Sequence, residues 1–200
     1  MPTQTSSTPL PAPPKDARDV RQRILECASE LFYRQGVRAV GVDLVVARSG
    51  VAKTSLYRHF RNKDELIAAF LQREDEEFWA HWDAVAARHA DAPLEELLAH
   101  MQWIGERVRR PNYRGCPQIN VSAEFPDQDH PSRHVARAHM LALRERLAGI
   151  ANKLGVARPD DLATQLAVLV NGAFVSMELL EGEPADRLLA ASAKALVAAA

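Results

Sequence analysis

Residues 43–60, DLVVARSGVAKTSLYRHF, are the most informative segment of the chain. It predicts a short helix, a tight turn at Gly50 and a second short helix. Gly50 tolerates the positive φ that a tight turn can require, and Ala47 is small enough for two helices to cross closely. The apolar residues expected to lock the two helices together are Val45, Val51 and Leu56.

The second of these helices is expected to present polar and basic side chains at its surface. Two short helices joined by a glycine turn are typical of a DNA-binding helix-turn-helix, whose second helix lies in the major groove. The side chains that this helix would offer are Lys53, Thr54, Ser55, Tyr57, Arg58 and His59. The pattern alone leaves open an ordinary helical hairpin with a solvated basic face.

The distribution of charge favours contact with a polyanion at this end of the chain. In total, 25 Lys and Arg oppose 26 Asp and Glu, for a formal net charge of −1. Residues 15–63 hold eleven of these basic residues and five of the acidic ones, so this segment is basic and the remainder acidic. Such asymmetry indicates a surface for nucleic acid, with local scatter of surface charge as the alternative.

The rest of the chain predicts an all-α fold of about nine helices. Apolar residues recur at helical spacing, and no segment shows sustained alternation with a period of two. Expected helices run from residue 16 to a cap at Gly36, then over about 42–49, 53–60, 63–89, 93–109, 118–124, 131–154, 159–182 and from 184 onward. Residues 1–15 contain little to bury and are expected to form a flexible tail.

Composition excludes several other classes of protein. The chain has no run of about 18 apolar residues and begins with neither a basic nor an apolar segment, which argues against a membrane span or a secretory signal. Its two cysteines, Cys27 and Cys116, are too few for a disulfide framework, so we expect a cytoplasmic protein. Neither a phosphate-binding glycine loop nor a zinc-protease motif is present, and we expect no enzyme and no cofactor.

Four pieces of the N-terminal part form a more specific pattern. They are Ile24-Leu25, Leu31-Phe32 followed by Gly36, residues 50–60, and Lys63-Asp64-Glu65-Leu66. In this pattern, Leu-Tyr-x-x-Phe followed by Lys-x-Glu-Leu is the most specific element. Residues 18–70 therefore resemble the N-terminal domain of the TetR/AcrR family of regulators.

The resemblance implies a sequence-specific DNA-binding transcriptional regulator, in most such proteins a repressor that a small ligand releases from a palindromic operator. Residues 16–62 would be the helix-turn-helix domain and residues 63–200 the ligand-binding and dimerisation domain. Tyr57 and Lys63 would hold phosphates, whereas Lys53 and Arg58 would reach base edges. The complete set of DNA-binding candidates is Arg48, Lys53, Thr54, Ser55, Tyr57, Arg58, His59 and Lys63.

This chain departs from the family pattern at three places. The hydroxyl residues usual before the second helix are replaced by Val40 and Gly41, and the usual Ser at the start of the recognition helix is Ala52. Leu44 occupies a position that is often acidic. Because losing a cap hydroxyl to alanine costs about 1 kcal/mol, we expect a slightly looser helix-turn-helix that relies more on Arg and Lys for phosphate contacts.

The C-terminal segments predict a dimer. Residues 162–180 are apolar nearly all round, and the resemblance implies that the last two helices, about 159–199, pair with those of a twofold mate. Small residues that would allow close approach are Ala163, Ala167, Gly172, Ala173 and Ser176. The apolar side of the last helix would comprise Leu188, Leu189, Leu196 and Val197. A monomer core of the same composition is the alternative.

Aromatic and sulfur-containing side chains are concentrated between residues 78 and 177, which favours an apolar pocket for a small, mostly apolar or aromatic ligand. The candidates are Phe78, Trp82, Met101, Trp103, Phe125, Phe174 and Met177. Each taken alone is more simply explained as core. Ligand binding would favour a conformation in which the long helix after residue 62 swings and separates the two recognition helices.

A redox- or metal-responsive regulator of the same fold is the alternative. Cys116 is a candidate redox sensor, and His130 and His134 lie four residues apart near a helix start. The chain lacks the dense Cys and His spacing of metal sites, so we predict no metal site.

Overall fold

The structure, a computed structural model, describes residues 15–177, 180 and 184–200, and within them the chain forms nine helices and no strand. The helices are α1 (Lys15–Gln35), α2 (Val42–Ser49), α3 (Lys53–His59), α4 (Lys63–Arg88), α5 (Pro93–Val108), α6 (Pro117–Glu124), α7 (Pro131–Leu154), α8 (Pro159–Ser176) and α9 (Ala185–Ala199). The predicted all-α fold of about nine helices is confirmed. The predicted tail lies outside the described residues except for Lys15, where α1 begins.

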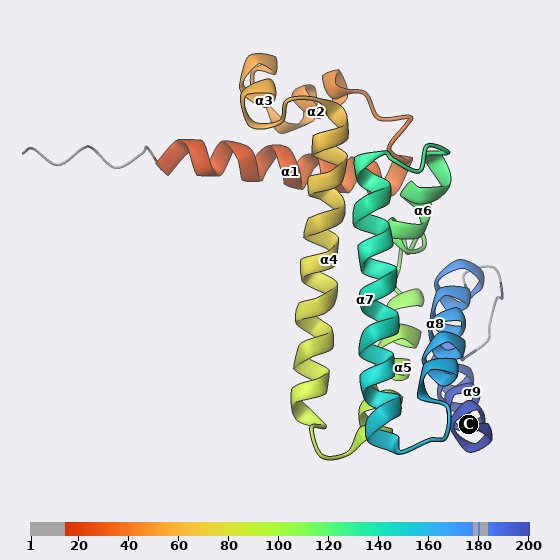
Figure 1. Ribbon diagram of the computed structural model, residues 1–200. Helices are drawn as coiled ribbons and strands as arrows, with labels where there is room; N and C mark the ends of the chain where they lie inside the picture. Colours follow the sequence, from red (N-terminus) through yellow and green to blue (C-terminus); the bar gives the residue numbers. More distant parts are fainter. Residues whose placement is uncertain (1–14, 178–179, 181–183) are drawn as a thin grey trace, which may run out of the picture.

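The helices form two regions, which we call the head (α1–α3) and the body (α4–α9). In Figure 1 the head lies across one end of the body, and α4 and α7 run side by side down most of the body's length. α5, α8 and α9 pack against them at the far end, and α6 lies between the body and the end of α1. α4 therefore connects the helix-turn-helix directly to the interior of the body.

Local chemistry explains several helix boundaries. Gly50 ends α2 with φ +67° in the left-handed region, as its place in the predicted turn requires. Asn62 precedes α4, and its side chain accepts a hydrogen bond from the backbone N–H of Glu65 (2.8 Å). Pro93, Pro117 and Pro131 each begin a helix, where a missing N–H costs nothing.

The buried side chains form two separate clusters. The head core is built on α1–α3 and is completed by the first turns of α4, which supply Leu66 to Leu71, and by Val121 of α6. The body core begins about two turns further along α4, at Phe78, and includes the tryptophans Trp82 and Trp103. The head core thus extends past residue 62, the predicted end of the first domain.

Three expectations about the C-terminal helices are wrong in detail. α8 ends at Ser176, before the predicted end near residue 182, which itself lies outside the described residues. Leu188 and Leu189 do not share a side of α9, since successive helical residues point about 100° apart: Leu189 is buried and Leu188 is exposed. Ala163 and Ala173 are buried within one protomer, so they are not available to a second copy.

Among the described residues, no helix combines the length and apolarity needed to cross a membrane.

Candidate DNA-binding surface and effector site

The recognition helix α3 is held by one buried face. Leu56 is 0% exposed, and Val45 of α2 and Val51 of the turn are buried beside it in the head core. These are the three residues predicted to lock the pair. Since α3 has only two turns, this contact fixes which side chains it turns outward.

The outward face of α3 is cationic and polar. Lys53, Thr54 and Arg58 are exposed, Tyr57 is 44% exposed, and Arg48 is exposed in the last turn of α2. The structure places Ser55, His59 and Lys63 half-buried. The Nε2 atom of His59 is enclosed and has no hydrogen-bond partner.

Asp43, which was not among the predicted site residues, positions Lys53. Its Oδ1 lies 2.7 Å from Lys53 Nζ, and both side chains are well exposed. The hydrogen bond to Asp43 raises the pKa of Lys53, which therefore stays charged. Ten residues separate the two, and only the folded turn brings them together, so spacing alone gave no signal.

Arg38 is a second residue that the sequence did not single out. It is exposed and lies close enough to Lys63 to contribute to lowering the pKa of that lysine, although burial of Lys63 is the larger cause. Arg38 belongs to the irregular turn between α1 and α2, where helical periodicity gives no information. The available signal was its inclusion in the basic segment.

Helix ends in the head show the expected departures from the family pattern. Gly41 and Ala52, at the N-caps of α2 and α3, make no side-chain cap hydrogen bond. At the other end of α2, Arg23 Nη2 donates to the carbonyl of Ser49 (3.0 Å). At α4, the N–H of Arg61 donates to Glu65 Oε2 (2.7 Å), which lowers the pKa of Glu65.

Six of the seven predicted ligand residues gather in the body. Phe78, Trp82, Met101, Trp103 and Phe174 are buried in the body core and Met177 packs against it. The ring centroid of Phe78 lies 4.9 Å from that of Trp103 and 6.4 Å from that of Phe174. Phe125 is not brought to this cluster: it packs against the head core and stacks on His130 at 3.8 Å.

A small cavity lies inside the body. It has a volume of about 10 Å³ and is lined by Glu74, Phe78, Arg107, Cys116, Pro117, Gln118, His139 and Phe174. A void of this size accommodates about one water molecule. A larger ligand would require its walls to move.

Head and body are joined by α6. Both carboxylate oxygens of Glu124 accept backbone hydrogen bonds from the turn after α1, from Val37 (3.1 Å) and from Arg38 (2.8 Å). The hydroxyl of Tyr33 in α1 donates to the carbonyl of Gly115 (3.3 Å) and accepts from the N–H of Arg114 (2.9 Å). These hydrogen bonds connect α6 and the segment before it to the end of α1.

The surroundings of His130, His134 and Cys116 bear on the redox and metal alternative. His130 precedes α7 and its Nδ1 accepts from the N–H of Ser132 (3.2 Å), while Nε2 lies 3.4 Å from Asp64 Oδ1. His134 is exposed, and no group of three metal-ligating side chains occurs among the residues described. Burial raises the pKa of the Cys116 thiol, which disfavours the reactive thiolate.

A small helical head with an outward cationic helix, on a larger helical body, defines a helix-turn-helix regulator. Comparison with known proteins supports this class. Residues 24–70 match the model of bacterial regulatory proteins of the tetR family. An HTH-type transcriptional regulator of Staphylococcus aureus is 35% identical over 71 residues, which are 36% of this chain; the chain spans only 38% of that relative's length.

Solved structures match over nearly the whole length. A TetR-family transcriptional regulator from Streptomyces coelicolor has a TM-score of 0.85 and 28% identity, covering 90% of this chain and 95% of the other. A protein from Streptomyces avermitilis classed as a TetR transcriptional regulator has a TM-score of 0.78 and 31% identity, covering 90% and 97%. The chain belongs to the TetR family of DNA-binding transcriptional regulators. Membership of a family of regulators agrees with the sequence-based exclusion of an enzyme.

Proposed function

We propose that this protein is a homodimeric repressor that binds a palindromic operator through α3 and leaves it when a small, mostly apolar or aromatic ligand binds in the body. In this proposal residues 16–62 form the DNA-binding domain, which the adjoining Lys63 assists, and residues 63–200 form the domain that binds the ligand and dimerises. The observation that carries the proposal is the exposed face of α3, with Lys53, Tyr57 and Arg58 turned outward from buried Leu56.

The exposed face matches what a duplex offers. Arg and Lys pair with guanine in the major groove, and phosphates accept from Lys, Arg and Tyr. We therefore assign base contacts to Lys53 and Arg58, and phosphate contacts to Tyr57 and Lys63. Arg38 extends the phosphate-binding set, since it is exposed and its charge acts on Lys63.

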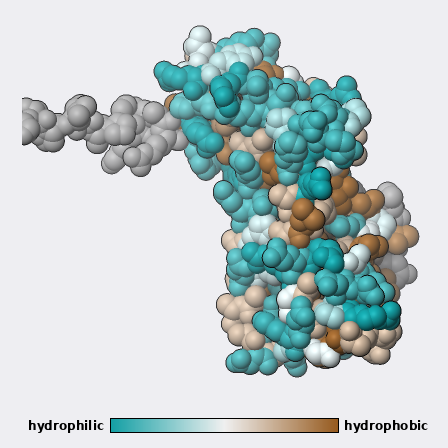
Figure 2. All heavy atoms as spheres, viewed as in Figure 1, coloured by the Kyte–Doolittle hydropathy of each residue, from teal (hydrophilic) through white to brown (hydrophobic). Residues whose placement is uncertain are grey.

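Exposed apolar side chains on α8 and α9 support a dimer. Val168 is 68% exposed and Val175 56% exposed in one protomer, and Leu188 lies exposed on α9. In Figure 2 hydrophobic atoms gather along the edge of the body where α8 lies, whereas the head is mainly hydrophilic. A second copy covering this face would set two α3 helices about one DNA turn apart or a multiple of it.

Release of the operator on ligand binding would act through α4 and α6. α4 contributes to both cores, and α6 holds the turn after α1 through Glu124. A ligand that enlarges the cavity would press on both helices, because Phe78 of α4 and Gln118 of α6 line it. It would shift the equilibrium by its differential affinity for the two conformations.

A redox- or metal-responsive regulator is the less favoured reading. The buried Cys116 thiol, the capping role of His130 and the exposure of His134 give no described residue a sensing geometry.

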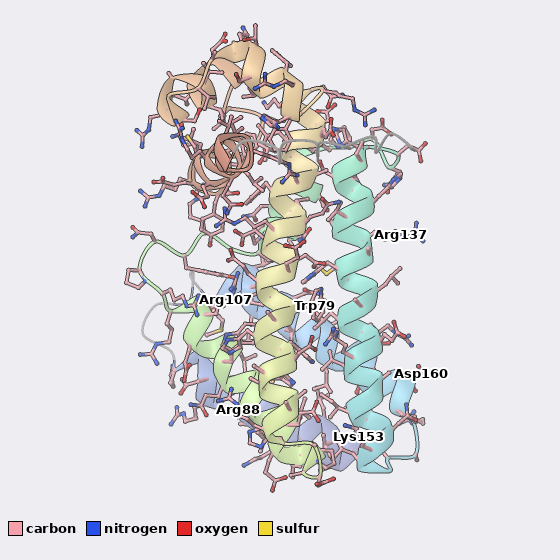
Figure 3. All side chains as sticks on the ribbon, turned by 90° about the vertical axis from the view of Figure 1, so that its left-hand side faces the viewer. Trp79, Arg88, Arg107, Arg137, Lys153 and Asp160 are labelled. Atoms are coloured by element: carbon pink, nitrogen blue, oxygen red, sulfur yellow. The ribbon has the colours of Figure 1, made fainter. Side chains whose placement is uncertain are left out.

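The test begins with selection of binding sites from a pool of random duplexes by the full-length protein. Affinity for the selected duplex is then measured by fluorescence anisotropy for the wild type, for Tyr57→Ala with Lys63→Ala, and for Arg137→Ala, an exposed control on α7 (Figure 3). We expect the double variant to lose about 10- to 100-fold in affinity while remaining folded, and the control to bind normally. Equal loss in the control, or no selected sequence, would refute the proposal.

A further inference from the structure

Two hollows in the molecule share a pair of charged residues. An open groove of about 390 Å³ lies between α1, α4 and the segment that follows α5, and the 10 Å³ cavity lies inside the body. Glu74 of α4 and Arg107 of α5 line both. This pair is therefore the wall that separates the groove from the cavity.

The pair is loosely held. Arg107 Nη2 lies 3.7 Å from Glu74 Oε2, longer than the 2.7–2.9 Å of a charge-assisted hydrogen bond, and each side chain is 21% exposed. Burial raises the pKa of Glu74 more strongly than Arg107 lowers it. Figure 3 shows Arg107 in the last turn of α5, on the side towards α4. Arg107 thus retains donors that a better-placed carboxylate could use.

The cavity contains an acceptor without a donor. Gln118 is 2% exposed, and its Nε2 donates to the carbonyl of Leu71 (3.0 Å). Its Oε1 is enclosed and has no partner. An unpaired buried polar atom costs about 1–3 kcal/mol, so this atom favours a ligand that brings a hydroxyl or N–H group. Phe78 and Phe174 supply apolar walls around it.

The groove contains donors without acceptors. Ser29 of α1 is 9% exposed and its Oγ has no partner. Arg73 Nε binds Glu77 (3.2 Å), but its Nη1 is enclosed and unpartnered. The acidic side chains of the groove are Glu26, Glu30, Glu74 and Glu77, and its basic ones are Arg73, Arg107 and Arg110. Glu30 is additionally paired with Arg34 of α1 (3.6 Å).

We propose that the effector is an organic anion that enters through this groove, with its carboxylate replacing Glu74 as the partner of Arg107. Its apolar body, carrying a hydrogen-bond donor, lies between Phe78 and Phe174, where the donor serves Gln118 Oε1. The groove has the volume of a small-molecule site, and the cavity opens as the Glu74 side chain is displaced. Because the groove also holds four glutamates, a cation is the competing class of effector, and the test includes one. This inference rests on the ligand-binding role proposed above and adds the ligand class and its anchor.

The experiment measures direct binding to the full-length protein by calorimetry without DNA. The probes are 3-(4-hydroxyphenyl)propanoate, its uncharged amide and the cation tyramine, which share a phenol and differ in charge. Each is titrated into the wild type, Arg107→Gln, Glu74→Gln and two matched controls, Arg109→Gln and Glu76→Gln. Arg109 and Glu76 do not line either hollow.

We expect the wild type to bind the anion in preference to the other probes. Arg107→Gln should weaken anion binding about tenfold or more, as expected for loss of a hydrogen bond to a charged group. Glu74→Gln should strengthen it about two- to fivefold by removing the competing carboxylate. Opposite responses of the two variants are the signature, because mere loss of stability would weaken binding in both. The controls should match the wild type.

Preference for tyramine or the amide, no anion binding, or a change of the same sign in both variants would overturn the proposal. Operator binding is measured in a separate experiment. A negative calorimetric result therefore leaves the DNA-binding role unaffected, and a negative operator-binding result leaves a positive calorimetric result unaffected.

Discussion

The head and the body bury their side chains in different ways. The head core is aliphatic and phenylalanine-rich, and the described side chains of α1–α3 include one buried polar residue, Ser29. The body buries Glu96, His100, Gln118, Ser132 and His139 together with two tryptophans. An apolar core suits a region that binds DNA through its surface. Buried polar groups suit a region that binds a ligand in its interior. Variants in the head, in the body and at the connection between them test this difference.

The largest effect, on dimer dissociation, is expected at the exposed apolar face of α8. Val168→Glu should raise the dissociation constant of the dimer at least about 100-fold, since burying an unpaired carboxylate in an apolar interface costs several kcal/mol. Sedimentation equilibrium measures this dissociation constant. Leu141→Glu, at an equally apolar exposed position on α7, is the control and should leave the assembly unchanged. Equal behaviour of the two variants would contradict a dimer through α8.

In the head, Leu56 is the one buried residue of α3 and anchors this helix to the head core. Leu56→Ala should destabilise the protein by about 2–5 kcal/mol, the usual cost of such a truncation in a core. Operator binding should be lost at temperatures where the body remains folded. Urea unfolding at fixed protein concentration, followed by tryptophan fluorescence of the body and by hydrogen exchange of the head, separates the two. Simultaneous loss of both regions would show that their cores are not energetically distinct.

The buried histidine of the body predicts a pH dependence. Burial, aided by His81 and His89, lowers the pKa of His100 to about 3. Below pH 6.5 the unfolded chain takes up a proton that the folded chain refuses, so stability falls as the pH falls from about 6.5 towards 3. Between pH 6 and 4 this group should cost about 2–3 kcal/mol.

His100→Leu tests this expectation by urea unfolding. Its stability should fall less steeply between pH 6 and 4 than that of the wild type, and the two slopes should agree above pH 7.5, where the histidine is neutral in both states. Identical slopes at acid pH would show that His100 titrates normally.

The connection between the two regions should be local and moderate. Glu124→Ala removes the acceptor of two backbone N–H groups and should cost about 1–3 kcal/mol, with faster hydrogen exchange at the amides of Val37 and Arg38. Glu106→Ala, on the exposed surface of α5, is the control. Unchanged exchange at both amides would remove α6 from the proposed route between ligand and DNA.

The smallest effect concerns the missing cap of α3. Ala52 is followed by backbone N–H groups that no side chain satisfies, and Ala52→Ser should stabilise the protein by about 0.5–1 kcal/mol. Thermal unfolding measures the gain. A loss of stability would mean that the N-terminus of α3 is satisfied in another way.

The sequence predicts the head better than the body, for a physical reason. The helix-turn-helix depends on local features such as Gly50 at the turn and Leu56 inside, and both have the predicted roles. Contacts between distant segments leave no such mark. Asp43 near Lys53, Glu124 at the turn after α1 and Arg107 beside Glu74 depend on packing, and none was anticipated.

In the body, apolar periodicity identified helices but not which face each one buries. Phe125 was grouped with the body aromatics by residue type, yet α6 directs it to the head core. Ala163 and Ala173 have the small size that close helix packing between copies requires, but that packing occurs inside the protomer.

The central claim is that the outward side chains of α3 select a DNA sequence. The most direct test is to pass the wild type and a variant with Lys53, Thr54 and Arg58 all changed to Ala through the same random-duplex selection. The account predicts a dyad-symmetric motif for the wild type and loss of base preference for the variant, with weak salt-sensitive binding retained. Recovery of the same motif by both proteins would contradict it.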